Sequence, residues 1–124
     1  MKRFCILAIA ASTAAAMVAA CGGDSDPIFA CTDIAVPGLS VTVVDSASGD
    51  TLPPPSVVVA KDGAYADTAG SINAPHYSLV YERKGTYVVT VTHAGYSSWH
   101  RSGVVVTADR CHVQTVQLTA KLQP

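Results

Sequence analysis

The sequence predicts an all-β domain built as a two-sheet antiparallel sandwich, and three observations lead to this prediction. Seven short segments rich in Val, Thr and Tyr recur at a spacing of about ten residues. Gly, Pro, Asp and Asn separate these segments. No stretch of about ten or more residues has the periodicity of an amphipathic helix. The chain has 124 residues, of which 49% are hydrophobic, and this length suffices for about one small domain.

Turn-forming residues mark where the strands end. Gly49 supplies a positive φ that other residues resist, and Asp62-Gly63 suits the tight turn of a β-hairpin. The prolines at 53–55 cannot donate backbone hydrogen bonds, so they indicate an extended edge and not a central strand. With these turns in place, strands are expected at residues 39–44, 56–60, 64–68, 77–82, 86–92, 103–107 and 112–122.

The segment 86–92 has the clearest strand pattern. Side chains alternate between the two faces of a strand, so Tyr87, Val89 and Val91 share one face and are predicted to point into the core. The same period on the last strand places four apolar residues on one face: Val116, Leu118, Ala120 and Leu122.

The N-terminus resembles a bacterial lipoprotein signal peptide. Lys2 and Arg3 precede an apolar, Ala-rich stretch that is too short for a confident membrane-spanning helix. This stretch ends Met-Val-Ala-Ala-Cys21, which looks like a lipobox. We therefore expect residues 1–20 to be cleaved and Cys21 to be acylated, which would anchor the protein to a membrane through its lipid.

Residues 21–30, which include the polar, Gly-bearing run 22–27, are expected to form a flexible tether, and residues 31–124 the folded domain. By resemblance to bacterial lipoproteins, Gly22 after the cysteine favours the outer membrane, facing the periplasm, as the location in the cell envelope. A formal net charge of −1 provides no electrostatic surface for nucleic acid.

Cys5 would leave with the signal peptide and Cys21 would carry the lipid, so Cys31 and Cys111 remain. An even pair in an exported, oxidising compartment predicts a disulfide between them. A reactive thiol or a thiolate metal ligand is the alternative, but the sequence has no CxxC motif. His112 adjoins Cys111, yet neighbours on the expected strand would point to opposite faces.

Three segments together resemble the carboxypeptidase regulatory-like domain family: LSVTVVD at 39–45, SGDTLP at 48–53 and GTYVVTVTHAGY at 85–96. The resemblance implies a seven-stranded transthyretin-like (prealbumin-like) Greek-key sandwich with no activity of its own. Three positions depart from the family pattern, where Ser48, Thr51 and His93 stand in place of the usual Thr, Pro and Ala. His93 places a polar ring where the family pattern has a small residue, so the packing around this position is not predicted by the resemblance.

Several kinds of catalytic or metal site lack support in the sequence. None of the four histidines, at positions 76, 93, 100 and 112, stands in an HxH or HxxxH pair, so no metal or cofactor is expected. No Gly-x-Ser-x-Gly elbow is present. Acid–base work by Glu82 would need a second carboxylate nearby from Asp33, Asp45 or Asp109, and nothing in the sequence brings them together. The related hydroxyisourate hydrolases end in Tyr-Arg-Gly-Ser, which this chain lacks.

The residues 95–101 form the segment with the strongest recognition chemistry, and we expect them to lie on a loop. They include Tyr96, Trp99, His100 and Arg101, and aromatic residues beside Arg are typical of binding hot spots. The alternative is that Trp99 caps the core and Arg101 is solvated.

The sequence thus predicts a non-catalytic envelope lipoprotein that acts as an accessory, structural or protein-interaction module. A carbohydrate- or small-ligand-binding module is the second interpretation, and an exposed Trp99 ring would favour it. A small envelope hydrolase is the third, and it would require three of the His, Asp or Glu residues to converge in a pocket. The expected partners are the membrane, through the lipid anchor, and an envelope protein or glycan.

Overall fold

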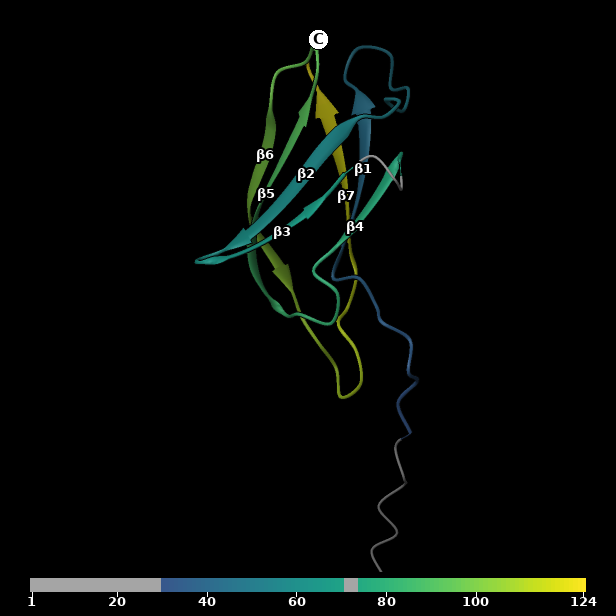
Figure 1. Cartoon of the computed structure of the whole chain (residues 1–124), viewed down its shortest axis with the longest axis vertical. Coiled ribbons are helices and arrows are strands. Elements are labelled where there is room, and N and C mark those ends of the chain that lie inside the picture. The colour runs from purple at the N-terminus through teal and green to yellow at the C-terminus, as the bar shows by residue number, and fades with distance from the viewer. Residues whose placement is uncertain (1–29, 71–73) are drawn as a thin grey trace, which may run out of the picture. The chain divides into compact units, whose positions relative to one another are not determined.

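The computed structural model describes residues 30–70 and 74–124, and this part of the chain is all-β (Figure 1). Cys31–Pro124 forms one compact unit. Its seven strands confirm the predicted class, and the described residues contain no helix. The strands are β1 (Leu39–Asp45), β2 (Ser56–Asp62), β3 (Tyr65–Ala69), β4 (His76–Leu79), β5 (Gly85–His93), β6 (Trp99–Val106) and β7 (Val116–Leu122).

Some predictions concern residues outside this part of the chain. The signal peptide at 1–20, the lipid-modified Cys21 and nearly all of the tether at 21–30 lie outside the described residues. Nowhere in 30–70 or 74–124 does a helix have the length and hydropathy needed to cross a bilayer.

The strands form two sheets, one with the order β4-β1-β7 and one with the order β3-β2-β5-β6. The prediction that all strands are antiparallel is wrong for one pair, since β1 and β7 run parallel from Leu39↔Val116 to Asp45↔Leu122. Alternating side chains look the same in parallel and antiparallel strands. The direction depends on how the chain connects two strands that are far apart in sequence, so local periodicity cannot reveal it.

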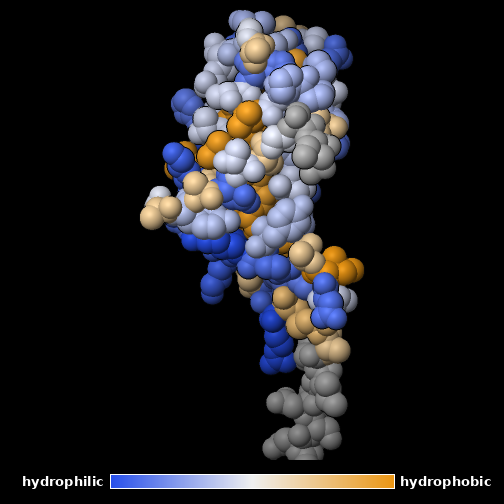
Figure 2. Space-filling model, viewed as in Figure 1, coloured by the Kyte–Doolittle hydropathy of each residue, from blue (hydrophilic) through white to orange (hydrophobic). Residues whose placement is uncertain are grey.

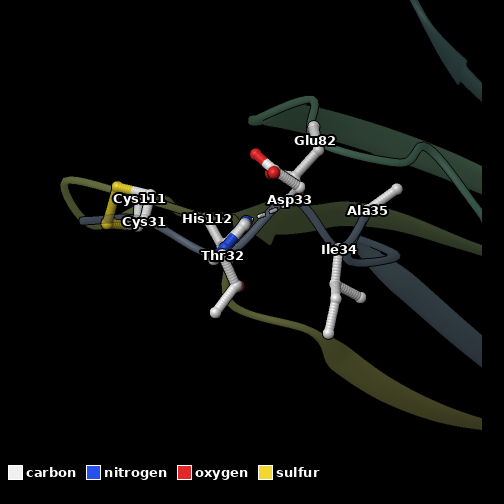
Figure 3. A pocket seen from close by; sticks show the side chains of 8 residues that line it. All are labelled: Cys31, Thr32, Asp33, Ile34, Ala35, Glu82, Cys111 and His112. Atoms are coloured by element: carbon white, nitrogen blue, oxygen red, sulfur yellow. Dashed lines mark hydrogen bonds and ion pairs between the residues drawn. A yellow bond between two sulfur atoms is a disulfide. The ribbon is translucent and has the colours of Figure 1, made fainter.

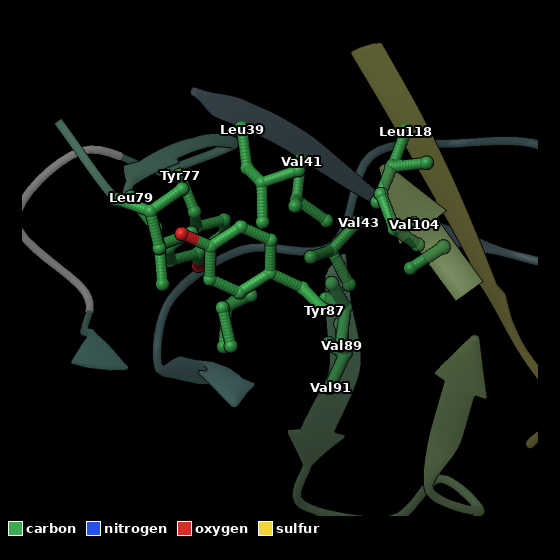
Figure 4. Packing of buried hydrophobic residues seen from close by; sticks show 14 of the residues in the cluster. Leu39, Val41, Val43, Tyr77, Leu79, Tyr87, Val89, Val91, Val104 and Leu118 are labelled. Atoms are coloured by element: carbon green, nitrogen blue, oxygen red, sulfur yellow. The ribbon is translucent and has the colours of Figure 1, made fainter. Parts of the chain in front are cut away.

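The core lies between the two sheets and is made of their inward-facing side chains (Figure 4). Tyr87, Val89 and Val91 are fully buried, as their alternation on β5 predicted. On β7 the predicted face is also correct, although Val116 at the start of the strand is only half-buried. The largest fully buried side chains are Tyr77, Tyr87, Leu39, Leu79, Leu122, Val41, Val43, Val58, Val80, Val89, Val91 and Val106.

The fourth strand ends earlier than predicted. It was expected to continue to Glu82, but β4 stops at Leu79. Val80 and Glu82 have φ values of 50° and 52°. A residue in this left-handed region cannot continue a strand, and Val rarely adopts it because its β-branch crowds the backbone. The chain therefore turns sharply at 80–82, and this turn carries Glu82.

The sixth and seventh strands also have different limits from those predicted. β6 begins at Trp99 and not at Gly103, because Gly103 lies inside the strand at a bulge. Its φ of 68° accommodates the extra residue opposite the stretch between Tyr87 and Val89 on β5. β7 begins at Val116, so His112 lies in the preceding loop and not on a strand.

Two buried tyrosines differ in how their hydroxyl groups are satisfied. Tyr87 donates a hydrogen bond to the Arg83 carbonyl oxygen at 2.9 Å and accepts one from the Arg83 guanidinium at 2.7 Å. Tyr77 is equally buried, but its hydroxyl has no hydrogen-bond partner. A buried polar group without a partner lowers stability.

Tyr77→Phe is therefore expected to leave the free energy of unfolding unchanged or to raise it by up to about 1 kcal/mol. Tyr87→Phe, the matched variant, is expected to lower it by about 1 kcal/mol because two hydrogen bonds are lost. Urea unfolding followed by tryptophan fluorescence measures both values. An equal loss of stability in the two variants would contradict this interpretation.

Candidate functional site

Three of the four predicted recognition residues lie on a strand and not on a loop. Trp99, His100 and Arg101 begin β6, an edge strand of the four-stranded sheet, and only Tyr96 lies in the preceding turn. The sequence suggested a loop because Ser97 and Ser98 follow Gly95, but the turn is complete by residue 98. The four side chains therefore belong to a turn followed by an edge strand.

The strand geometry separates these side chains. Trp99 pairs with the inward-facing Val91 and is half-buried against the core. His100 pairs with Thr90 and points to the opposite face of the sheet. Arg101 is exposed at the edge. The residues thus form an edge with one anchored aromatic ring and two exposed polar groups, not a closed pocket.

Tyr96 has a structural contact of its own. Its hydroxyl donates a hydrogen bond to Asp45 Oδ2 at 2.8 Å, and its ring meets the His93 ring edge-on at 5.3 Å between centroids. Asp45 Oδ1 accepts further bonds from the backbone N–H groups of Ala47 and Ser48. The Tyr96 hydroxyl, followed by these backbone groups, holds the pKa of Asp45 below its usual range.

Two of the histidines are bound to hydroxyl groups of the neighbouring strand. His76 Nδ1 lies 2.9 Å from Thr42 Oγ1 on the outer face of the three-stranded sheet. His93 Nδ1 lies 2.8 Å from Ser56 Oγ, and Ser56 is fully buried. The Ser56 hydroxyl explains how the fold accommodates a polar ring at position 93, where the family resemblance implied Ala.

A shallow depression at the other end of the domain brings together a different set of residues (Figure 3). The predicted disulfide between Cys31 and Cys111 is present, with the two Cα atoms 5.3 Å apart. It lies at one side of the depression, and the residues that follow its two cysteines meet there. The lining residues are Cys31, Thr32, Asp33, Ile34, Ala35, Glu82, Cys111 and His112.

His112 connects two groups across this depression. Its Nδ1 lies 2.8 Å from Glu82 Oε1, and its Nε2 lies 2.9 Å from Thr32 Oγ1. The same Glu82 oxygen accepts a hydrogen bond from the Val36 N–H at 2.7 Å. The Val36 N–H, together with His112, lowers the pKa of Glu82 below its usual value. Glu82 is therefore an ionised acceptor at neutral pH.

Asp109 fixes the loop that presents His112. Its Oδ1 accepts hydrogen bonds from the backbone N–H groups of Cys111 and His112, at 2.8 and 2.9 Å. Its Oδ2 accepts one from the Gln114 side chain at 2.8 Å. These bonds hold the pKa of Asp109 below its usual range, with the His112 N–H as the largest cause. The backbone that carries the imidazole is thus held by a charge-assisted network.

Sequence reasoning missed this cluster because its three members come from three distant segments. Thr32 lies in the N-terminal segment of the domain, Glu82 in the turn after β4 and His112 in the loop before β7. One signal was present in the sequence: Thr32 and His112 each follow a cysteine of the predicted disulfide. A bridge between two cysteines also brings the residues next to them close together.

The fold and the disulfide define a small, disulfide-bonded domain of the two-sheet, all-β class. No family model matches the chain, and no curated protein is similar enough to count as a relative. Within 30–70 and 74–124, no group of three His, Cys, Asp or Glu side chains could hold a metal ion.

Acid is expected to destabilise the domain, because the pKa values of Asp45, Glu82 and Asp109 are all lowered in the folded state. The unfolded chain, with higher carboxyl pKa values, binds more protons as the pH falls. The stabilisation is therefore complete above the ordinary carboxyl pKa and is lost as the pH falls through the lower folded values.

Urea unfolding at a series of pH values from about 7 to about 3 measures this loss. The free energy of unfolding should stay level at first and decline below about pH 5. Asp45→Asn should be less stable than the wild type near neutral pH and should lose less stability in acid. A wild-type free energy that stays level down to about pH 3 would contradict the expectation.

Proposed function

We propose that the chain is a lipid-anchored protein of the bacterial cell envelope whose sandwich serves as an accessory, structural or protein-interaction module. The N-terminal sequence with its lipobox-like end at Cys21 supports the anchor. Gly22 after that cysteine supports the outer membrane, facing the periplasm, as its location. The Cys31–Cys111 disulfide is consistent with an oxidising compartment.

We further propose that the sandwich is a transthyretin-like Greek-key domain of the carboxypeptidase regulatory-like family. Of the three resembling segments, the first forms β1 and the third forms β5 and the turn after it, and the bond between Tyr96 and Asp45 joins the ends of these two segments. Tyr87 of the third segment fills the core, as a buried aromatic residue in such a motif should. A module of this family is expected to contribute contacts and not chemistry through its signature segments.

The interaction role is supported by the arrangement of the side chains at the start of β6. The half-buried Trp99 is held against the core, while His100 and Arg101 beside it are exposed. A rigid aromatic anchor next to an exposed Arg suits a protein contact. A carbohydrate module would need a more fully exposed ring on which a sugar could stack, so the half-burial of Trp99 favours the protein partner.

The rest of the surface agrees with a localised contact. On the face that Figure 2 shows, hydrophobic residues form small patches separated by hydrophilic ones. The exposed large hydrophobic residues of the described part are Ile34, Val57, Tyr81, Val88 and Val105. Val88 and Val105 lie diagonally opposite each other on β5 and β6. Exposed hydrophobic residues in ones and twos are normal on protein surfaces, so the contact proposed here depends on the residues at the start of β6.

The lipid anchor predicts incorporation of labelled fatty acid. Cells that express the full chain and receive an alkyne-tagged palmitate should yield a labelled protein in the membrane fraction. Cys21→Ser should remove the label and leave an unprocessed, larger chain. Cys5→Ser, the matched variant inside the proposed signal peptide, should keep the label. Equal labelling of the Cys21→Ser chain would overturn the proposed anchor.

The contact surface predicts a loss of crosslinks in a His100→Ala/Arg101→Ala variant. Intact envelopes treated with a short amine-reactive crosslinker should yield a reproducible adduct with the wild-type chain and less of it with this variant. Gln117→Ala/Thr119→Ala, on the exposed face of β7, is the control, removes no amine and should retain the adduct. A folded variant with unchanged adducts would exclude this surface.

A further inference from the structure

Three imidazole rings in the described residues contact a hydroxyl group, and only one of them also contacts a carboxylate. His76 and His93 use Nδ1 for their hydroxyl partners. His112 uses Nε2 for Thr32 and Nδ1 for Glu82, at 2.9 and 2.8 Å. Hydroxyl, imidazole and carboxylate in series form the arrangement with which hydrolases activate a nucleophilic oxygen.

The ionisation of Glu82 determines where the proton of a neutral His112 ring lies. A carboxylate can only accept hydrogen bonds, so Nδ1 must be the ring nitrogen that carries the hydrogen. Nε2 then has a free lone pair, and the Thr32 hydroxyl donates to it. This tautomer is the one in which a ring can act as general base toward the hydroxyl.

Each of the three groups is held by a second constraint. The disulfide fixes the residues that precede Thr32 and His112. Glu82 is held by the Val36 N–H and lies in the turn with a φ of 52°. A left-handed conformation at a non-glycine residue costs energy, and such strain gathers at functional sites. The arrangement is therefore positioned by the fold and does not depend on the three side chains alone.

The arrangement is also open to solvent, unlike the pair at Ser56. The side chains of His112 and Glu82 are 21% and 37% exposed. Figure 3 shows them facing each other in the depression, with Ile34 on the side away from the disulfide. Ile34 is 70% exposed, which offers an apolar contact in the same depression as the hydroxyl. A small molecule could reach Thr32 here, whereas the Ser56 hydroxyl is fully buried.

We propose that Thr32 and His112, positioned by Glu82, form a catalytic site that hydrolyses carboxylic esters with a short acyl group. The apolar contact with Ile34 and Ala35 would take the acyl chain, and two residues of this size can cover only a short one. This activity goes beyond the accessory role proposed above, because that role uses the start of β6 at the other end of the domain (Figure 1).

The reaction consists of two displacements at the acyl carbon. Thr32 Oγ1 attacks the ester carbonyl carbon while its proton passes to His112 Nε2. The bond from that carbon to the alcohol oxygen breaks, and the alcohol leaves with the proton from Nε2. Water then attacks the acyl-threonine, gives one proton to Nε2 and releases the carboxylic acid. The proton on Nε2 returns to Thr32, so ester and water become alcohol and acid.

Hydrolysis of 4-nitrophenyl acetate by the purified full chain tests the site. The wild type should release 4-nitrophenolate faster than buffer, and Thr32→Ala and His112→Gln should each lower the rate by about 10²-fold or return it to the buffer rate. Thr32→Ser should retain activity. Thr42→Ala removes a hydroxyl bound to a histidine without a carboxylate, and as the matched control it should have the wild-type rate.

Glu82→Gln tests the positioning role separately. It should lower kcat and leave KM unchanged, because the carboxylate orients the ring and does not touch the substrate. A purely structural role would instead lower the melting temperature and leave kcat per folded molecule unchanged. Melting curves of every variant show whether it is folded. The 4-nitrophenyl octanoate ester should gain little over the acetate, because Ile34 and Ala35 would contact only the first part of its chain.

A covalent trap identifies the nucleophile directly. Treatment with a fluorophosphonate should add its phosphonyl group to Thr32, and mass spectrometry of the peptides should locate the adduct there. Thr32→Ala should remove the adduct and Thr42→Ala should not. An adduct at another residue, or a folded Thr32→Ala protein that hydrolyses the acetate at the wild-type rate, would overturn the proposal. The crosslinking result for the His100→Ala/Arg101→Ala variant does not affect this test, so the contact surface and the catalytic site can fail independently.

Discussion

The parallel pairing of the first strand with the last is the interaction on which the other features depend. β1 and β7 are matched along their whole length, from Leu39↔Val116 to Asp45↔Leu122. This register brings the segment before β1 alongside the loop before β7, where Cys31 meets Cys111. At the other end it holds Asp45 where Tyr96 can reach it. Both ends of the sandwich are therefore organised by one pair of strands.

The strands were predictable from the sequence because each is a local pattern. Tyr87, Val89 and Val91 alternate with threonine and valine, and burial on one face follows directly from a period of two. The limits of strands were less predictable where the backbone departs from a regular strand. A valine at positive φ after β4 and a glycine bulge inside β6 cannot be recognised from residue types, since each depends on contacts made elsewhere in the fold.

The candidate site was predictable only in part, and its two cysteines show why. The pairing of Cys31 and Cys111 followed from counting, because the predicted signal peptide and lipid anchor left no other pair. The contact of His112 with Thr32 follows from that pairing, but its contact with Glu82 requires the turn at 80–82. Physical proximity of this kind is a property of the register and turns, so residue composition could not predict it.

The disulfide links the proposed location of the protein with its proposed chemistry. Thr32 lies in the segment that leads into β1, and the bridge is what joins the start of this segment to the loop that carries His112. Without the bridge, each of the two residues would depend on its own weaker contacts, and a hydrogen bond exposed to water contributes little by itself. A cytosolic chain, with its cysteines reduced, would therefore have the sandwich without a well-positioned Thr32. In an oxidising envelope compartment the same sequence would hold the hydroxyl against the imidazole, so the catalytic geometry would depend on export through this one covalent bond.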